Sequence, residues 1–221
     1  MTSKDIAVIK KSQLFLGMED NEVDHLLGCL SAAGRDYKKN QIILHSGDST
    51  NSIGMVISGR VHILKEDFWG NRNIITEALP GDVFAEGYAC TQGTELEISV
   101  VPAEDSRILF LEVRRLITTC PNSCAFHVKL VRNLLSVMAR KNLMMDEKLT
   151  HLTKRTTREK LLSYLSSESR RQGSASFEIP YNRQQLADYL SVDRSAMTSE
   201  LSRMRDEGLL TFEKNRFRLL I

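Results

Sequence analysis

Short hydroxyl side chains and arginines recur on one side of a predicted helix near the C-terminus. The helix follows Asp193, and that face carries Arg194, Ser195, Thr198, Ser199, Ser202 and Arg203. Guanidinium groups and hydroxyls form hydrogen bonds to phosphate oxygens and to the edges of bases. A helix face that is merely solvated more often carries Glu and Lys. The residue types therefore favour contact with DNA, and an ordinary helical hairpin is the alternative.

A second helix is predicted directly before this face. Asn182 is suited to cap a helix that begins at Arg183, and apolar residues then recur at helical spacing over 186–190. Residues 191–193 interrupt the pattern, and Gly208 ends the helix that follows them. Two short helices joined by a tight turn predict a helix-turn-helix, although Ser191 stands where this turn usually prefers glycine.

The end of the chain has the pattern of a β-hairpin. Two β-rich runs flank Lys214 and Asn215, and Lys214, Arg216 and Arg218 can reach a phosphate backbone from it. A further short strand is expected over 177–180. Together with the helix-turn-helix, these strands predict a winged helix.

A long amphipathic helix is predicted from Pro121 to Leu152, capped by Thr118, Thr119 or Cys120. Its apolar side repeats alternately every four and three residues, and it consists of Cys124, Val128, Val131, Leu135, Met138, Asn142, Met145, Leu149 and Leu152. This heptad spacing favours a parallel two-stranded coiled coil in which the polar Asn142 sets the register. The alternative is a helix buried against its own domain.

Three residues near the start of this helix have spacing that suits redox or metal chemistry. Cys120, Cys124 and His127 stand at positions i, i+4 and i+7 and so share one helical face. A thiolate at Cys120 would be favoured by the helix dipole, which makes a redox site, a metal site or a haem ligand one interpretation. The other interpretation is structural: Cys120 caps the helix, Cys124 is a small seam residue and His127 is a surface side chain.

The middle of the chain is rich in short strands. Runs of about five residues alternate with Gly, Pro and Asn turn signals, and the expected strands are 37–44, 53–57, 61–65, 74–78, 98–101 and 107–111. Short strands at such spacing predict a sandwich or a barrel.

Length and composition limit the number of domains and the class of protein. The 221 residues, 42% of them hydrophobic, leave room for one larger and one smaller globular domain. No run approaches the roughly 20 apolar residues of a membrane span, and four scattered cysteines fit a reducing compartment, so we expect a cytoplasmic protein without membrane attachment. Residues 153–221 carry 13 Lys/Arg against 9 Asp/Glu, whereas residues 1–152 carry 17 against 19. The basic excess therefore accompanies the helix-turn-helix, where phosphate contacts need it.

The order of these parts resembles the Crp/Fnr family of bacterial transcription regulators. The resemblance covers nearly the whole chain and rests on the strand-rich entry at 36–46, the phrase Gly81-Asp-Val-Phe-Ala-Glu86, the long helix and the helix-turn-helix residues 183–195. It implies an α+β fold with an N-terminal double-stranded β-helix (a cyclic-nucleotide-binding-like β-roll), a long dimerisation helix and a C-terminal winged helix-turn-helix. The implied domains are 1–119, 120–152 and 153–221.

The resemblance also implies a mode of DNA binding. A homodimer would bind a pseudo-palindromic operator in double-stranded DNA, with RNA polymerase as a further partner. By position, Arg194, Ser195 and Ser199 occupy base-reading places, whereas Asn182, Arg183 and Thr198 are similar to backbone-contacting residues. Adding the basic residues of the helix and the hairpin gives the expected DNA-binding set Asn182, Arg183, Arg194, Ser195, Thr198, Ser199, Arg203, Lys214 and Arg216. Family members have Glu at the place of Ser195 and Arg at that of Ser199, so their target sequence does not carry over.

The effector cassette departs from the cyclic-nucleotide pattern. Family members that bind cyclic nucleotides use a Glu and an Arg-Ser pair; Glu86 matches the Glu, but Leu96 and Glu97 occupy the places of the pair. A carboxylate facing a phosphate without a guanidinium is repulsive, so cyclic AMP is disfavoured. An iron–sulfur cluster is disfavoured too, because Cys29 is the only cysteine before Cys90. Haem and thiol redox chemistry stay open.

Two functions from other classes are alternatives. A β-roll can host a metal and act as a cupin-like enzyme, but this usually needs a His-x-His pair with a carboxylate, which the sequence lacks. We therefore expect a protein that is not an enzyme. The second alternative is a protein-interaction module that uses the winged helix without DNA, and it would show no salt-dependent DNA binding.

Overall fold

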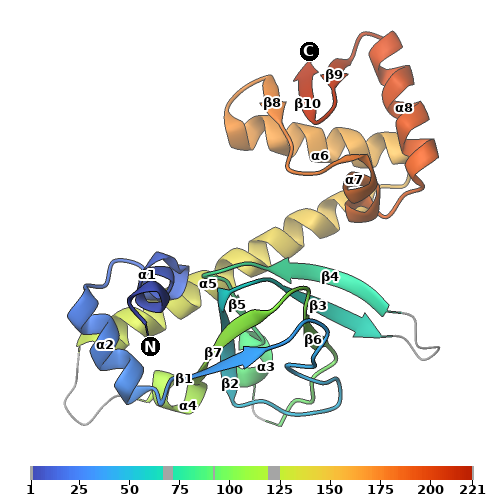
Figure 1. The fold of residues 1–221 in the computed structure, drawn as a ribbon. Coiled ribbons are helices and arrows are strands. Elements are labelled where there is room, and N and C mark those ends of the chain that lie inside the picture. The colour runs from blue at the N-terminus through green and yellow to red at the C-terminus, as the bar shows by residue number, and fades with distance from the viewer. Residues whose placement is uncertain (1, 67–71, 92, 119–124, 221) are drawn as a thin grey trace. The chain divides into compact units, whose positions relative to one another are not determined.

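The computed structural model describes residues 2–66, 72–91, 93–118 and 125–220 (Figure 1). The chain divides into two compact units, Met1–Arg140 and Lys141–Ile221, and each is described by itself. Both contain helices and sheets, as the predicted α+β class requires. No helix within the described ranges has both the length and the apolar character needed to span a bilayer.

The N-terminal unit begins with short helices, namely α1 (Ser3–Lys11), η1 (Gln13–Phe15) and α2 (Asp20–Cys29). Thr2 and Asp5 form a capping box at the start of α1, in which each side chain accepts a hydrogen bond from the backbone of the other. Ile9, Leu14 and Phe15 are fully buried. The helices therefore act as an apolar cover for the strands that follow.

Two antiparallel sheets form the β-roll of this unit. The first has the order β1-β7-β2-β5 and the second the order β4-β3-β6. Their strands are β1 (Ala33–Tyr37), β2 (Ser52–Ser58), β3 (Val61–Glu66), β4 (Arg72–Ala78), β5 (Val83–Phe84), β6 (Ser99–Pro102) and β7 (Ser106–Glu112). Gly54 is required on β2 because a Cβ atom there would lie 2.2 Å from the ring of Phe84.

Strand β2 of the first sheet is buried on both of its faces. Ile53 and Met55 of β2 belong to a core shared with the N-terminal helices, whereas Val56 belongs to a second core with Val100 of the other sheet. Because side chains alternate along a strand, one run of apolar residues supplies both cores. The continuous apolar stretch at 53–57 in the sequence has this structural reason.

The predicted strand at 37–44 is wrong in its position along the chain. The structure places the strand earlier, at Ala33–Tyr37, and leaves only an isolated bridge between Leu44 and Val100. A turn takes over after Tyr37: Asn40 adopts a positive φ of 65°, and Asp105 accepts a hydrogen bond from the backbone N–H of Lys39 at 3.0 Å. The turn at Asn40 and the long-range contact from Asp105 therefore end the strand despite the apolar residues beyond it.

Helix α5 (Ala125–Leu152) follows two short helices, α3 (Glu86–Cys90) and α4 (Val113–Ile117). In the N-terminal unit, Leu130, Leu134 and Val137 of α5 are buried in the core shared with α1 and α2. The amide of Asn133 donates hydrogen bonds to the carbonyls of Leu14 at 3.0 Å and Leu16 at 3.1 Å. Of the predicted helix start at 118–121, only Thr118 is described: it ends α4, where its hydroxyl donates to the carbonyl of Arg114 at 2.7 Å, and residues 119–121 lie outside the described ranges.

The C-terminal unit has the predicted winged helix-turn-helix. Its elements after α5 are α6 (Thr157–Gln172), β8 (Ser176–Glu178), α7 (Arg183–Leu190), α8 (Arg194–Asp206), β9 (Leu210–Glu213) and β10 (Arg216–Leu219). The strands form one antiparallel sheet in the order β8-β10-β9. Leu161, Leu186, Leu201 and Leu210 are fully buried in its core, which holds α6, α7 and α8 against the sheet.

Candidate nucleic-acid interface and effector cassette

Side-chain caps fix the first turns of α7 and α8, and Ser191 ends α7 at the turn between them. The side chain of Asn182 accepts from the backbone N–H of Gln185, and the side chain of Gln185 accepts from that of Asn182, both at 2.9 Å. Asp193 caps α8 by accepting from the N–H of Ala196 at 2.8 Å. Ser191, where glycine is usual, adopts the left-handed conformation with φ 50°. Its carbonyl and that of Leu190 accept hydrogen bonds from the Lys160 ammonium, which helps to hold the strained turn.

Helix α8 separates apolar from polar residues. Met197, Leu201 and Met204 are fully buried. The residues predicted to face DNA are exposed: Arg194, Ser195, Thr198, Ser199 and Arg203. The structure therefore brings these five side chains to one accessible face, as the helical spacing predicted.

The hydroxyl groups of this face differ in their hydrogen bonds. Ser195 donates to the carboxylate of Asp193 at 2.5 Å, and Thr198 donates to the carbonyl of Arg194 at 2.8 Å. Ser202 donates to the carbonyl of Thr198 at 3.1 Å. Within the described part of the chain, the hydroxyl of Ser199 makes no hydrogen bond.

Arg183 lies against the wing. Its guanidinium carbon is 4.8 Å from the ring centre of Phe212 and 5.0 Å from that of Phe217. Burial lowers the pKa of Arg183 from its usual value. The guanidinium therefore stacks on the wing as a cation–π contact. The sequence analysis predicted a contact of Arg183 with the DNA backbone and did not predict this stacking.

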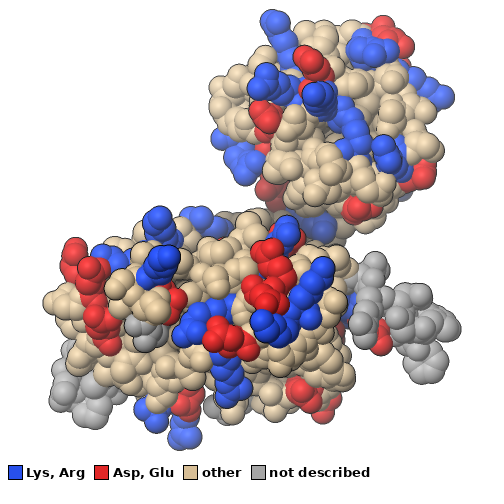
Figure 2. Space-filling model, viewed as in Figure 1, with Lys and Arg blue, Asp and Glu red and all other residues tan. Residues whose placement is uncertain are grey.

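The wing presents basic side chains at its turn and on β10. Lys214 occupies the turn with φ 52°, and Lys214, Arg216 and Arg218 are exposed. The guanidinium of Arg216 lies 3.5 Å from the carboxylate of Glu178, an exposed pair of little strength. Figure 2 shows basic side chains spread over the visible face of this unit.

Arg158 is a structural residue that sequence reasoning missed. Its guanidinium donates to Glu200 at 2.5 Å and to both carboxylate oxygens of Glu207 at 2.7 and 2.9 Å. These hydrogen bonds raise the pKa of Arg158 and lower the pKa of Glu207. Arg158 therefore links α6 to α8 and compensates acidic side chains of the recognition helix. No sequence pattern signals it, because Arg158 and Glu200 are 42 residues apart.

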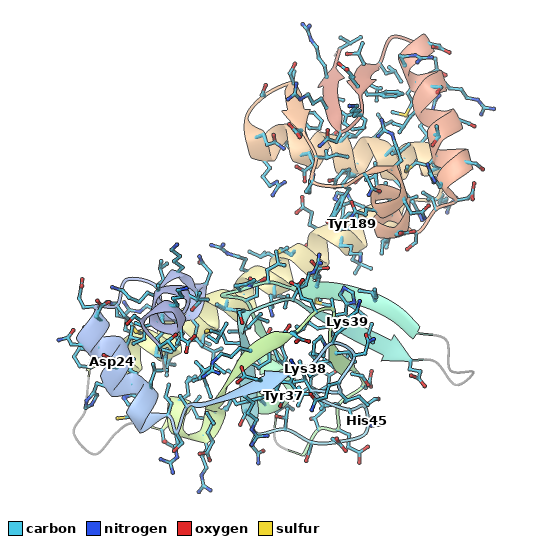
Figure 3. All side chains as sticks on the ribbon, viewed as in Figure 1. Asp24, Tyr37, Lys38, Lys39, His45 and Tyr189 are labelled. Atoms are coloured by element: carbon cyan, nitrogen blue, oxygen red, sulfur yellow. The ribbon has the colours of Figure 1, made fainter. Side chains whose placement is uncertain are left out.

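A cluster of aromatic rings lies at the base of α7, where Tyr189 is labelled in Figure 3. The ring centres of Tyr189 and Tyr181 are 5.0 Å apart, and that of Tyr164 lies 5.4 Å from Tyr189. His151 of α5 packs edge-on against Tyr164 and its Nδ1 lies 2.8 Å from the hydroxyl oxygen of Ser163. Burial lowers the pKa of His151, so the imidazole is held neutral in this cluster.

In the effector cassette of the β-roll, a buried residue and an exposed residue stand where cyclic-nucleotide-binding members of the family carry the Arg-Ser pair. Leu96 is 2% exposed and packs in the same core as Phe84 and Val100. Glu97 points outward, with 70% of its side chain exposed, and pairs with the ammonium of Lys65 at 2.8 Å. This hydrogen bond lowers the pKa of Glu97 and raises the pKa of Lys65.

Glu86, the third cassette residue, begins α3 and is 8% exposed. The preceding Ala85 has a positive φ of 60°, which turns the chain sharply from β5 into α3. The cassette therefore keeps its backbone turn and its carboxylate, but it presents an apolar side chain inward at Leu96.

Of the three residues with redox or metal spacing, only His127 lies among the described residues. It is 4% exposed, so the interpretation of His127 as a surface side chain is wrong. Burial, and to a lesser extent the nearby His25, lower its pKa. The described ranges contain no group of three or more His, Cys, Asp or Glu placed to hold a metal ion, and Cys120 and Cys124 lie outside them.

Comparison with known proteins gives the family. A profile described as cyclic nucleotide-binding domain matches residues 34–122, and one described as Crp-like helix-turn-helix domain matches residues 159–221. The Cyclic AMP receptor protein of Thermus thermophilus is 26% identical over 206 residues, which covers 91% of this chain and 89% of the relative. The FnrA transcriptional activator of Stutzerimonas stutzeri is 23% identical, with 94% and 83% covered. The chain belongs to the Crp/Fnr family of transcription regulators.

Solved structures of two proteins share the fold. The Catabolite Activator Protein of Thermus thermophilus has a TM-score of 0.56 at 23% identity and covers 94% of this chain and 93% of its own. CprK complexed with OCPA has a TM-score of 0.59 at 13% identity, with 89% of each chain covered. The predicted family and fold class are therefore confirmed. The chain is a DNA-binding transcription regulator and not an enzyme, which discards the cupin-like alternative.

Proposed function

We propose that this Crp/Fnr regulator binds a pseudo-palindromic operator as a homodimer and controls transcription through RNA polymerase in the cytoplasm. Its DNA affinity would change when an effector or a redox signal other than cyclic AMP acts on the β-roll and α5. The observation that carries the proposal is the face of α8, where arginines and short hydroxyl side chains are exposed above a fully buried apolar side.

The proposed DNA contacts fall into two groups. Arg194, Ser195 and Ser199 would read base edges from the first turns of α8, because a recognition helix contacts bases with its N-terminal residues. The positioning contacts would come from the ends of α7, the rest of α8 and the wing, through Asn182, Arg183, Thr198, Arg203, Lys214 and Arg216. An exposed guanidinium at Arg194 can donate twice to guanine O6 and N7.

The proposed dimer rests on apolar side chains of α5 that the single chain leaves in water. Val128 is 57% exposed, Leu135 63%, Met145 72% and Leu149 58%. The predicted seam Val131, Leu135, Met138, Asn142, Met145 and Leu149 includes three of them. A large apolar stripe at heptad spacing is unfavourable in water and fits the same stripe of a second copy.

The cassette supports an effector other than a cyclic nucleotide. A cyclic phosphate near Glu86 would meet a carboxylate, the apolar Leu96 and an outward-facing Glu97, with no guanidinium at the two positions where cyclic-nucleotide members carry Arg and Ser. A phosphate without a compensating donor loses its hydration at a cost. The proposed alternative is a ligand or redox signal of different chemistry, and Cys120, Cys124 and His127 stay candidates for a thiol or haem sensor.

Selection of binding sites from random duplex DNA, followed by titration at several salt concentrations, tests the DNA part. We expect a two-fold symmetric motif with half-sites about one helical turn apart and an affinity that falls linearly with the logarithm of salt concentration. Absence of salt-dependent binding to any duplex would favour a protein-interaction module.

Isothermal calorimetry with millimolar cyclic AMP and cyclic GMP tests the effector part. We expect no saturable heat from either nucleotide. Saturable binding at micromolar concentration would show that another cation completes the cassette and would overturn this part of the proposal alone.

A further inference from the structure

Two groups share the carboxylate that caps the recognition helix. Asp193 accepts from the backbone N–H of Ala196 at 2.8 Å and from the hydroxyl of Ser195 at 2.5 Å. These hydrogen bonds, that of Ser195 foremost, lower the pKa of Asp193, so it is ionised at neutral pH. An ionised carboxylate can only accept hydrogen bonds, and the shared proton therefore belongs to Ser195.

This bond decides what Ser195 has left to offer a ligand. A serine hydroxyl has one proton and two lone pairs. Because the proton is directed to Asp193, the exposed part of the hydroxyl presents lone pairs only. A hydroxyl that donates to an anion is also a stronger acceptor, since hydrogen bonds in a chain polarise one another.

We infer that Ser195 reads the operator as a hydrogen-bond acceptor and selects a base with an exocyclic amino group, adenine or cytosine, at its position. The inference rests on the proposed function, which places Ser195 at a base edge. In the major groove adenine N6 and cytosine N4 are donors, whereas guanine and thymine present acceptors. An acceptor at Ser195 would face their lone pairs without a proton between them. Asp193 is the positioning residue that sets this polarity.

Ser199 provides the contrast on the same helix face. It is exposed like Ser195, and among the described residues its hydroxyl makes no hydrogen bond. A rotating hydroxyl can donate or accept, so Ser199 imposes no polarity on the base it meets. Ser199→Ala therefore removes a hydroxyl of the same size one turn further along α8 and serves as the matched control.

The first step of the test finds the base that Ser195 faces. Sites are selected from random duplex DNA with the wild-type dimer, with Ser195→Ala and with Ser199→Ala. We expect Ser195→Ala to relax one base pair per half-site and Ser199→Ala to leave that pair unchanged. Adenine or cytosine on the contacted strand supports the inference, and a pair that contacts Ser195 through guanine or thymine overturns it.

The second step measures the contact with modified operators. In one modified duplex, the base at that position is replaced by an analogue without the exocyclic amino group. In a second duplex, the purine of the same base pair, on whichever strand it lies, is replaced by its 7-deaza analogue. Wild type and Ser199→Ala should lose about threefold to tenfold in affinity on removal of the amino group, as expected for one neutral hydrogen bond. The affinity of Ser195→Ala should not fall further when the amino group is removed, because this variant already lacks the hydrogen bond to it. Coupling of Ser195 to the 7-deaza change instead would overturn the inference.

Asp193→Ser tests the positioning role while keeping a residue type that caps helices well. The shorter side chain no longer holds the Ser195 proton, so the affinity ratio between the normal and the amino-deleted operator should fall toward that of Ser195→Ala. This ratio is insensitive to a uniform change in affinity or folding, and an unchanged ratio would overturn the role of Asp193. If the wild-type protein selects no motif at all, the proposed function fails; if it selects one without the amino coupling, only the inference about Ser195 fails.

Discussion

The two units keep the same family fold but differ in what they place at their sites. In the helix-turn-helix, Arg194 is exposed on α8, where a guanidinium can meet a base or a phosphate. In the β-roll, the place of the cassette arginine is taken by Leu96, which is 2% exposed in a closed apolar core. Under the proposed function, the shared fold would keep the family's binding chemistry in the helix-turn-helix and not in the cassette.

Charge is also handled differently in the two units. Glu97 and Lys65 of the β-roll form an exposed pair, which water screens. In the C-terminal unit, Arg158 pairs with Glu200 of α8 and with Glu207, the residue that caps its C-terminal end, and so holds the recognition helix to α6. The comparison indicates that ion pairs support the geometry of the DNA-facing helix, whereas apolar packing supports the cassette.

The largest expected effect comes from the helix that contributes to both units. Leu135→Asp would put a charge into the proposed seam of α5, where Leu135 is 63% exposed in the single chain. We expect monomers in sedimentation and a loss of operator affinity of at least about 100-fold, because two half-sites no longer bind together. Ser136→Asp, which adds the same charge to the exposed neighbour, should stay dimeric. A tight dimer of Leu135→Asp would contradict the seam and leave the comparison of the two sites standing.

Leu96→Arg challenges the comparison at the cassette. An arginine at this buried position would bring a charge into the apolar core of Phe84 and Val100, and an uncompensated buried charge costs about 3–5 kcal/mol. The free energy of unfolding of the N-terminal unit should fall by that amount in denaturant titrations, whereas Leu96→Met should cost less than about 1.5 kcal/mol. Full stability of Leu96→Arg, together with new cyclic AMP binding, would show that one residue separates this cassette from the cyclic-nucleotide type.

Arg194 and Arg183 sharpen the comparison within the C-terminal unit. Arg194→Ala should cost about 1–3 kcal/mol of operator binding per half-site and flatten preference at one base pair. Arg183→Ala should weaken all sequences alike, reduce the salt slope by about one per half-site and lower the melting temperature, because its stack on Phe212 and Phe217 is lost. Arg205→Ala, which removes another cation near Phe212 at 5.8 Å, is the control. An unchanged motif with Arg194→Ala would mean that α8 docks differently.

The smallest expected effect concerns pH. His151 is neutral in its buried cluster, with a pKa below its usual value, while the unfolded chain protonates near pH 6.5. The stability of the C-terminal unit should therefore fall as the pH drops below about 6.5, and the loss should level off once the native imidazole is also protonated. His151→Gln should flatten this slope in melting curves between pH 7.5 and 5.5. Equal slopes for wild type and His151→Gln would contradict the buried neutral state.

Local signals in the sequence determined the helix-turn-helix, the wing and the long helix. Asn182 and Asp193 are caps that act within three residues, and the strands of the wing flank a two-residue turn. The alternation of apolar residues on α8 follows from helical geometry alone. The exposed face of α8 could therefore be predicted, since each of these features depends on near neighbours in the chain.

Tertiary packing decided the contacts between distant residues. It placed Arg183 on the wing rings, Arg158 between two glutamates, His127 in the core and Leu96 under the cassette turn. It also moved the first strand of the roll to Ala33–Tyr37, because Asp105 of the loop before β7 holds the turn that ends it. Burial and partner choice depend on which elements the fold brings together, and the spacing of residues along the chain does not specify that.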